Sequence, residues 1–202
     1  MDEIVLRGMA KWPNVPAVYG WLALDRRGNW LIKGERIPNQ LVTAFIGRNY
    51  ARDARGCWYF QNGPQRVFVN LDYAPFVYRI VSPDNAPLAL EAHNGRPVRA
   101  VSGAWMDENG ALLLETDIGA GSVHDRDLER LLPHLIDANG NPLPEAVIDE
   151  IMEQVEHGKR LPLWLKFRES NVRIEPIAAR EAAGRFGFVA QPEPPAGEEV
   201  CR

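Results

Sequence analysis

Four turns of the form Asp-x-x-Gly divide the sequence into short apolar runs, and this punctuation constrains the fold more than any other feature. The turns lie in two pairs, and an apolar stripe with helical spacing separates the two members of each pair. Trp21 precedes the first turn of one pair, and Trp105 precedes the first turn of the other. The nearly equal spacing predicts an internal duplication, whereas coincidence of a common turn type is the alternative. The four turns span 25–28, 53–56, 107–110 and 137–140.

The apolar runs beside these turns have the length and the flanking turn residues of β-hairpins. The Asn62-Gly63 pair marks the clearest one, because a tight hairpin turn requires the positive φ angles that these residues tolerate. The run from Pro75 to Val81 continues in extended character. The predicted hairpins join 20–24 to 29–33, 57–60 to 66–71, 98–106 to 111–118, and 161–167 to 172–177.

Three segments carry helical patterns. The first follows Pro38 and ends near Tyr50. The second begins near Ser122, and Pro133 should break or kink it. The third is the best marked: its apolar face repeats over 147–155, Pro144 opens it and Gly158 ends it. Residues 1–18 form an amphipathic arm that its prolines keep from becoming one continuous helix.

These elements predict an α+β protein of two similar strand-rich units. Each unit is a twisted antiparallel sheet with a helix, and the longer helix belongs to the second unit. We expect the first unit at 1–90 and the second at 91–189, joined through a segment rich in Pro, Asn and Gly at 82–97. Residues 190–202 are acidic and rich in proline, which predicts a disordered tail.

Charge and composition narrow the class of function. The formal net charge of -4 disfavours nucleic acid as a partner. The acidic start lacks the basic n-region of a secretory signal, and no apolar run is long enough to span a membrane, so we expect a cytoplasmic protein. Cys57 and Cys201 have neither disulfide-framework nor metal-ligand spacing. We therefore expect no metal site and no cofactor.

The chain contains no recognisable nucleophile motif, phosphate-binding loop or calcium loop, so catalytic residues stay unknown. The least improbable catalytic group is His124 with Asp125 and Asp127, because an imidazole beside carboxylates can act as a base. Such an enzyme would assemble its site at the junction of the two halves. An acidic helix start that compensates the helix dipole explains the same residues without catalysis, and we favour that interpretation.

One strand face combines an aromatic ring with cations. By strand alternation Trp164, Lys166 and Arg168 share a side, opposite Leu163, Leu165 and Phe167, and Arg173 lies across from them. This side is our candidate ligand-binding face for an acidic peptide or a lipid headgroup, although a solvated sheet face has the same pattern. It favours a non-enzymatic binding or regulatory protein whose partner is a protein, a peptide or a small molecule. A homodimer formed through sheet edges is a further possibility.

The stretch over residues 25–80 resembles a proteobacterial family of unknown function whose fold repeats pleckstrin-homology-like motifs. The most specific match is Asp72-Tyr73-Ala74-Pro75-Phe76-Val77, and the remaining matches lie in the segments GNWLIKGERI, LVTAF, GCWYF and VFVNL. The resemblance implies a two-part, strand-rich bacterial protein with a role in signalling or ligand sensing. It implies no catalytic residues.

Overall fold

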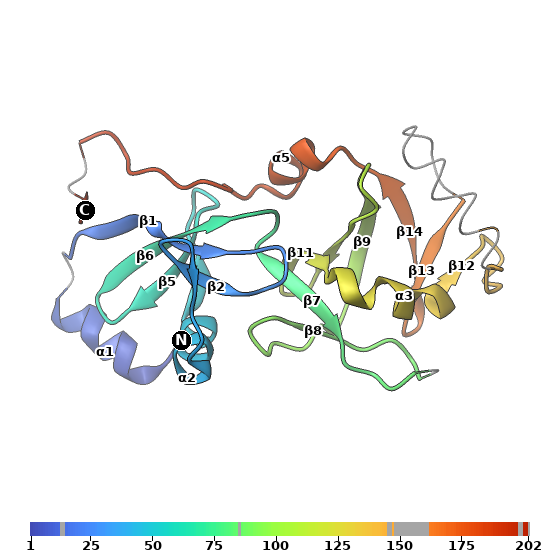
Figure 1. Ribbon diagram of the computed structural model, residues 1–202, viewed down its shortest axis with the longest axis horizontal. Coiled ribbons are helices and arrows are strands. Elements are labelled where there is room, and N and C mark those ends of the chain that lie inside the picture. The colour runs from blue at the N-terminus through green and yellow to red at the C-terminus, as the bar shows by residue number, and fades with distance from the viewer. Residues whose placement is uncertain (13–14, 85, 145–146, 148–161, 198–199, 202) are drawn as a thin grey trace. The chain divides into compact units, whose positions relative to one another are not determined.

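The structure is a computed structural model that describes residues 1–12, 15–84, 86–144, 147, 162–197 and 200–201 (Figure 1). The chain forms two compact units. Unit 1 comprises Met1–Pro75 with Gly187–Arg202, and unit 2 comprises Phe76–Phe186. The described residues form two sheets and few helices, which confirms a strand-rich α+β protein. No helix among them is long and apolar enough to cross a membrane.

Unit 1 contains a mixed sheet in which the strand order is β3-β2-β1-β6-β5-β4, and β15 pairs with β1. Neighbouring strands along this order are antiparallel, except that β1 and β6 run parallel. The helix α2 connects β3 to β4. The elements are α1 (Glu3–Lys11), β1 (Ala17–Leu24), β2 (Trp30–Ile32), β3 (Glu35–Arg36), α2 (Gln40–Arg48), β4 (Tyr50–Arg52), β5 (Trp58–Asn62), β6 (Gln65–Leu71) and β15 (Val200–Cys201).

Local signals explain the elements of unit 1. The Asn39 side chain accepts hydrogen bonds from the backbone N–H groups of Leu41 and Val42, so it caps α2 at its N-terminus. The Asn62-Gly63 turn joins β5 to β6 as the sequence predicts. The arm at the N-terminus becomes the helix α1, which ends at Lys11, before the first proline.

Unit 2 contains the sheet order β12-β13-β14-β9-β10-β11-β7-β8. The parallel neighbours are β14 with β9 and β11 with β7. A short helical segment, η1-α3-η2, connects β11 to β12. The elements are β7 (Phe76–Ile80), β8 (Leu90–Ala92), β9 (Val101–Met106), β10 (Leu112–Thr116), β11 (Gly119–Val123), η1 (Asp125–Asp127), α3 (Leu128–Leu131), η2 (Leu132–His134), β12 (Leu135–Ile136), β13 (Trp164–Phe167), β14 (Ser170–Pro176), η3 (Ala179–Glu181) and α5 (Ala182–Phe186).

Aliphatic and aromatic side chains from several strands fill the core of unit 2. Tyr78 is the largest of them that is fully buried. Its hydroxyl lies 2.9 Å from the Thr116 hydroxyl and donates to the Gly119 carbonyl at 2.8 Å, so the buried polar atom is satisfied. The three consecutive leucines of β10 are buried as well, which places this strand at the centre with both faces covered.

Two predicted boundaries are wrong. The segment 82–97 is not a linker, because Leu90 and Ala92 are buried and β8 pairs with β7 inside unit 2. Ser122 does not begin a helix: it lies in β11, and the capping residue is His124, whose side chain accepts the Arg126 N–H. Pro133 lies in η2, just beyond the end of α3, as expected. The predicted helix over 144–158 falls, apart from 144 and 147, outside the described residues.

The segment that follows unit 2 returns to the sheet of unit 1. Val189 donates its N–H to the Gly56 carbonyl at 3.1 Å, and Leu71 donates to the Ala190 carbonyl at 2.8 Å. Further on, Val200 and Cys201 pair with β1. The predicted disordered tail, 190–202, thus begins with residues that have defined backbone partners, a difference that its proline-rich composition did not suggest.

Candidate functional site

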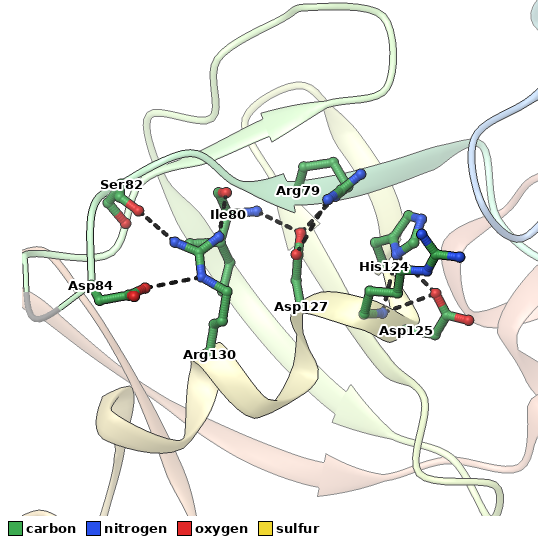
Figure 2. A network of polar contacts seen from close by, with 9 residues as sticks. Arg79, Ile80, Ser82, Asp84, His124, Asp125, Asp127 and Arg130 are labelled. Atoms are coloured by element: carbon green, nitrogen blue, oxygen red, sulfur yellow. Dashed lines mark hydrogen bonds and ion pairs between the residues drawn. The ribbon is translucent and has the colours of Figure 1, made fainter.

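The carboxylate of Asp127 is buried in unit 2 and is fully committed to structural partners (Figure 2). It accepts hydrogen bonds from Arg79 Nε at 2.6 Å, Arg79 Nη2 at 3.4 Å and the Ile80 N–H at 3.0 Å. Burial opposes ionisation, but these donors outweigh it and hold the pKa of Asp127 below its usual value. Arg79 therefore forms its ion pair with Asp127.

Arg130, one turn along, ties the same helical segment to the end of β7. Its guanidinium donates to the Ile80 carbonyl at 2.9 Å and to the Ser82 carbonyl at 2.7 Å, and it forms an ion pair with Asp84 at 3.2 Å (Figure 2). These bonds satisfy backbone groups that leave the sheet at this point. Asp127 and Arg130 together act as a clamp between β7 and the connection from β11 to β12.

His124 also has a structural role. Its Nδ1 accepts the Arg126 N–H at 3.1 Å, as a helix cap does, and lies 2.8 Å from Asp125. Burial and the charge of Arg79 lower the pKa of His124, so the imidazole is neutral at pH 7. His124, Asp125 and Asp127 are thus close together, but Nδ1 of His124 and both carboxylate oxygens of Asp127 make their contacts within the fold.

We expect His124 to titrate below its ordinary midpoint of about 6.5. A pKa that is lowered on folding means that protonation favours the unfolded chain, so this group removes stability as the pH falls below its unfolded pKa. NMR titration of the imidazole protons measures the midpoint in the folded chain and, as the comparison, in the denatured chain. A midpoint at or above the ordinary value would contradict the burial of a neutral ring.

The candidate binding face in unit 2 carries most of the predicted residues together. Trp164 pairs with Arg173 across β13 and β14, and the guanidinium of Arg173 lies 5.5 Å from the centre of the Trp164 ring. Lys166 is exposed on the same strand, and Leu163, Leu165 and Phe167 are buried on the opposite side, as alternation predicts.

Arg168 departs from this face. It lies in the turn after β13 with a φ of 54°, and its Nη2 reaches the Val98 carbonyl at 3.4 Å. A second arginine that the sequence did not nominate takes part instead. Arg185 lies 4.9 Å from the centre of the Trp105 ring. Trp105 pairs with Glu175 across β9 and β14, so its side chain lies on the same side of the sheet as those of Glu175 and Arg173. Arg173 is also paired to Glu175 at 3.2 Å.

A pocket of about 560 Å³ lies on one face of the unit 1 sheet. Its floor is the parallel stack of Tyr19 on Phe68, with ring centres 4.4 Å apart. Arg55 lies 5.3 Å from the Phe68 ring, and Arg66 lies 4.9 Å from the ring of Tyr59. These residues were not nominated from the sequence, although alternation along the hairpin at Asn62-Gly63 already puts Arg66 and Phe68 on one side.

No group of three or more potential metal ligands occurs among the side chains that the structure describes. The side chain of each aspartate in the Asp-x-x-Gly turns accepts hydrogen bonds from backbone N–H groups of its own turn. Asp107, for example, accepts the N–H groups of Asn109 and Ala111 at 2.9 Å each. The Asp-x-x-Gly segment at 107–110 is therefore a hydrogen-bonded turn.

Comparisons with known proteins agree with a protein of this architecture. Of the solved structures, a DUF1285 family protein from Silicibacter pomeroyi DSS-3 has a TM-score of 0.54 at 15% identity, covering 80% of this chain and 84% of that one. A DUF1285 family protein from Shewanella baltica OS155 has a TM-score of 0.41 at 15% identity, covering 57% of this chain and 89% of that one. The first likeness shows a related fold alone. No curated protein matches the chain. A family model described as "Protein of unknown function (DUF2946)" matches residues 1–193, and the chain belongs to that family.

Proposed function

We propose that this protein is a non-enzymatic binding protein, built from two copies of one module, that presents the same aromatic and cationic sheet face in each copy to acidic ligands. The copies run from β1 to β6 and from β9 to β14. The finding that carries the proposal is a pair of aromatic rings at corresponding positions of the two copies, each of which has an arginine from the neighbouring strand stacked on it.

The strand order supports the duplication. In unit 1 a meander of β1, β2 and β3 is followed by a helix and a second meander, whose last strand β6 runs parallel to β1. In unit 2 the same description holds for β9, β10 and β11, a helical connection, and β12 to β14, where β14 runs parallel to β9. Independent origins would not favour identical order and direction over six strands.

The register supports a residue-by-residue correspondence. Leu24 pairs with Leu71, and Met106 pairs with Pro176; Leu24 and Met106 each directly precede the first Asp-x-x-Gly turn of their copy. Three positions before Leu71 and Pro176 stand Phe68 and Arg173. Their antiparallel partners are then Tyr59 in unit 1 and Trp164 in unit 2.

At these corresponding rings the chemistry is alike. Arg66 from β6 lies over Tyr59, and Arg173 from β14 lies over Trp164. A guanidinium that stacks on an aromatic face keeps its N–H edge available for a carboxylate or phosphate. The repeat of this arrangement favours a role in binding anions over a face that is merely solvated.

We propose an acidic peptide as the ligand of the unit 2 face, made by Trp164, Lys166 and Arg173. Arg168, the fourth residue predicted for this face, lies in the turn beyond it. Lys166, Arg173 and Arg185 place cations at this face, and Glu175 pairs with Arg173, so the contacts described here favour an acidic partner. The signalling or ligand-sensing role and the pleckstrin-homology-like repeat that the sequence resemblance implies remain part of this proposal, as does assembly of a homodimer.

Replacing Lys166 and Arg173 together by glutamine is expected to weaken binding of an acidic peptide by about tenfold or more, because two charged partners are lost. Fluorescence anisotropy with a labelled eight-residue peptide of glutamate and phenylalanine measures the change. Arg126→Gln, an exposed arginine away from this face, is the matched control and should bind as the parent chain does. Equal affinity of the double variant and the control would refute the proposed face.

A further inference from the structure

The pocket of unit 1 has walls that the corresponding face of unit 2 does not share in its described part. Met9 and Trp12, from and just beyond α1, form one wall, and Pro195 from the returning segment forms another. A volume of about 560 Å³ lies within the range of sites for small molecules. The sheet face that is open in unit 2 is thus partly enclosed here, which suits a compact ligand better than a peptide.

The pocket has one cation that is not used by the fold. Arg55 forms an ion pair with Asp53 at 3.0 Å and donates to the Tyr19 hydroxyl at 3.3 Å. Arg66 is exposed and stacks on Tyr59, and no hydrogen bond or ion pair engages its guanidinium within the part of the chain that is described. Its donors are free to bind an anion, and a guanidinium matches a carboxylate or phosphate through two parallel hydrogen bonds.

A second observation concerns Gln61, which is 1% exposed and lines the pocket. Its Nε2 donates to the Gly63 carbonyl at 2.9 Å, whereas its Oε1 is buried and lacks a donor within the described part of the molecule. Buried acceptors are seldom left unpaired, because an acceptor that has lost its water without gaining a donor destabilises the protein. A ligand that brings an O–H or N–H to this wall would supply the missing partner.

The aromatic lining adds a preference for a flat body. Trp12 is 53% exposed, and Lys11 lies 4.5 Å from the centre of its ring. Tyr19 is half-buried at the floor beside Phe68. Planar rings stack on such side chains at a small cost in conformational freedom, so an aromatic ligand gains more here than a flexible chain of equal size.

We infer that this pocket binds a small planar molecule that carries an anionic carboxylate or phosphate for Arg66 and a hydrogen-bond donor for Gln61. The inference rests on the proposed function, because the pocket is the unit 1 copy of the proposed binding face. It goes further in assigning a different class of ligand to this copy, a small molecule instead of a peptide.

Isothermal titration calorimetry with three related probes tests the assignment. 6-Hydroxy-2-naphthoate carries the ring, the carboxylate and the donor; 2-naphthoate lacks the donor, and 2-naphthol lacks the carboxylate. We expect the first probe to bind most tightly, and 2-naphthol to bind at least about tenfold more weakly. Arg66→Gln should lower affinity for the first probe by a similar factor, whereas Arg36→Gln, an exposed arginine on β3, should leave it unchanged.

Absence of binding by the parent chain at millimolar probe, or equal binding by the Arg66→Gln and Arg36→Gln variants, would overturn the inference. Equal affinity for the two naphthoates would overturn the part assigned to Gln61. The peptide assay keeps this result separate from the proposed function. Naphthoate binding that depends on Arg66, without peptide binding, would leave the pocket in place and remove the peptide ligand; the reverse result would remove the pocket alone.

Discussion

We expect the replacement of Asp127 by alanine to lower the free energy of unfolding by about 3 kcal/mol, because an ion pair and a buried backbone hydrogen bond are lost together. The buried Ile80 N–H loses its acceptor, and Arg79 loses its charged partner. The side chain of Asp127 is 4% exposed, while that of Arg79 is 49% exposed. Water can therefore solvate the orphaned arginine, which limits the loss. Chemical denaturation of the full chain measures the difference.

Asp127→Asn is the matched control, since asparagine keeps an oxygen for Ile80 but loses the charge. We expect its destabilisation to be smaller than that of the alanine variant. The pH dependence gives a second check. Because folding lowers the pKa of Asp127, the carboxylate stabilises the protein above its unfolded pKa of about 3.9 and loses that contribution as the pH falls through the lower, folded value. The difference in the free energy of unfolding between the parent and Asp127→Asn should therefore decrease as the pH falls through this range.

If Asp127→Ala unfolded at the same denaturant concentration as the parent, the clamp between β7 and the helical connection would not exist as described. A gap between parent and Asp127→Asn that stayed constant down to pH 2 would contradict the ionised, hydrogen-bonded carboxylate. Either result would reopen a chemical role for this residue.

We expect Gly56→Ala to lower the free energy of unfolding by about 3 kcal/mol, whereas Gly140→Ala, at a corresponding turn, should lower it by about 1 kcal/mol. Both glycines have positive φ, 86° and 85°, so both variants carry the same backbone strain. A Cβ on Gly56 would clash with the Gly187 carbonyl oxygen, while one on Gly140 meets nothing within 4 Å. The difference between the two variants therefore measures the contact with the returning segment. It is determined by denaturation of both variants side by side.

Equal costs for the two alanine variants would show that the segment from Gly187 to Ala190 does not pack against the turn at Gly56 in solution. This result would also leave open the disorder that the composition of 190–202 predicts. A larger cost at Gly56 supports the backbone pairing of Val189 and Ala190 with unit 1.

The hairpins and their faces follow from the sequence because their determinants are local. An aspartate whose side chain accepts nearby N–H groups sets each turn, and period-two alternation then decides which side of a strand is buried. Leu165 and Phe167 are buried and Lys166 is exposed for this reason. The same logic, applied to Arg66 and Phe68, would have found the unit 1 face.

Other features depend on contacts between residues distant in sequence, so local pattern could not predict them. The partner of Arg79 is Asp127, which reaches it only because β7 lies beside β11. The strand β8 lies in a segment that is rich in turn residues, so the composition predicts a linker there. The pocket needs α1 and the returning segment beside the sheet, an arrangement that neither hydrophobic spacing nor turn chemistry encodes.

An NMR titration of the full chain with the acidic peptide locates the binding site directly. The signals to follow are the indole N–H groups of the protein's tryptophans and the Nε–H groups of its arginines. The two-copy binding account predicts that Trp164 and Arg173 shift together and in proportion to occupancy, while Trp30, which is 3% exposed in unit 1, stays in place. Saturating peptide that leaves Trp164 and Arg173 unmoved would contradict it.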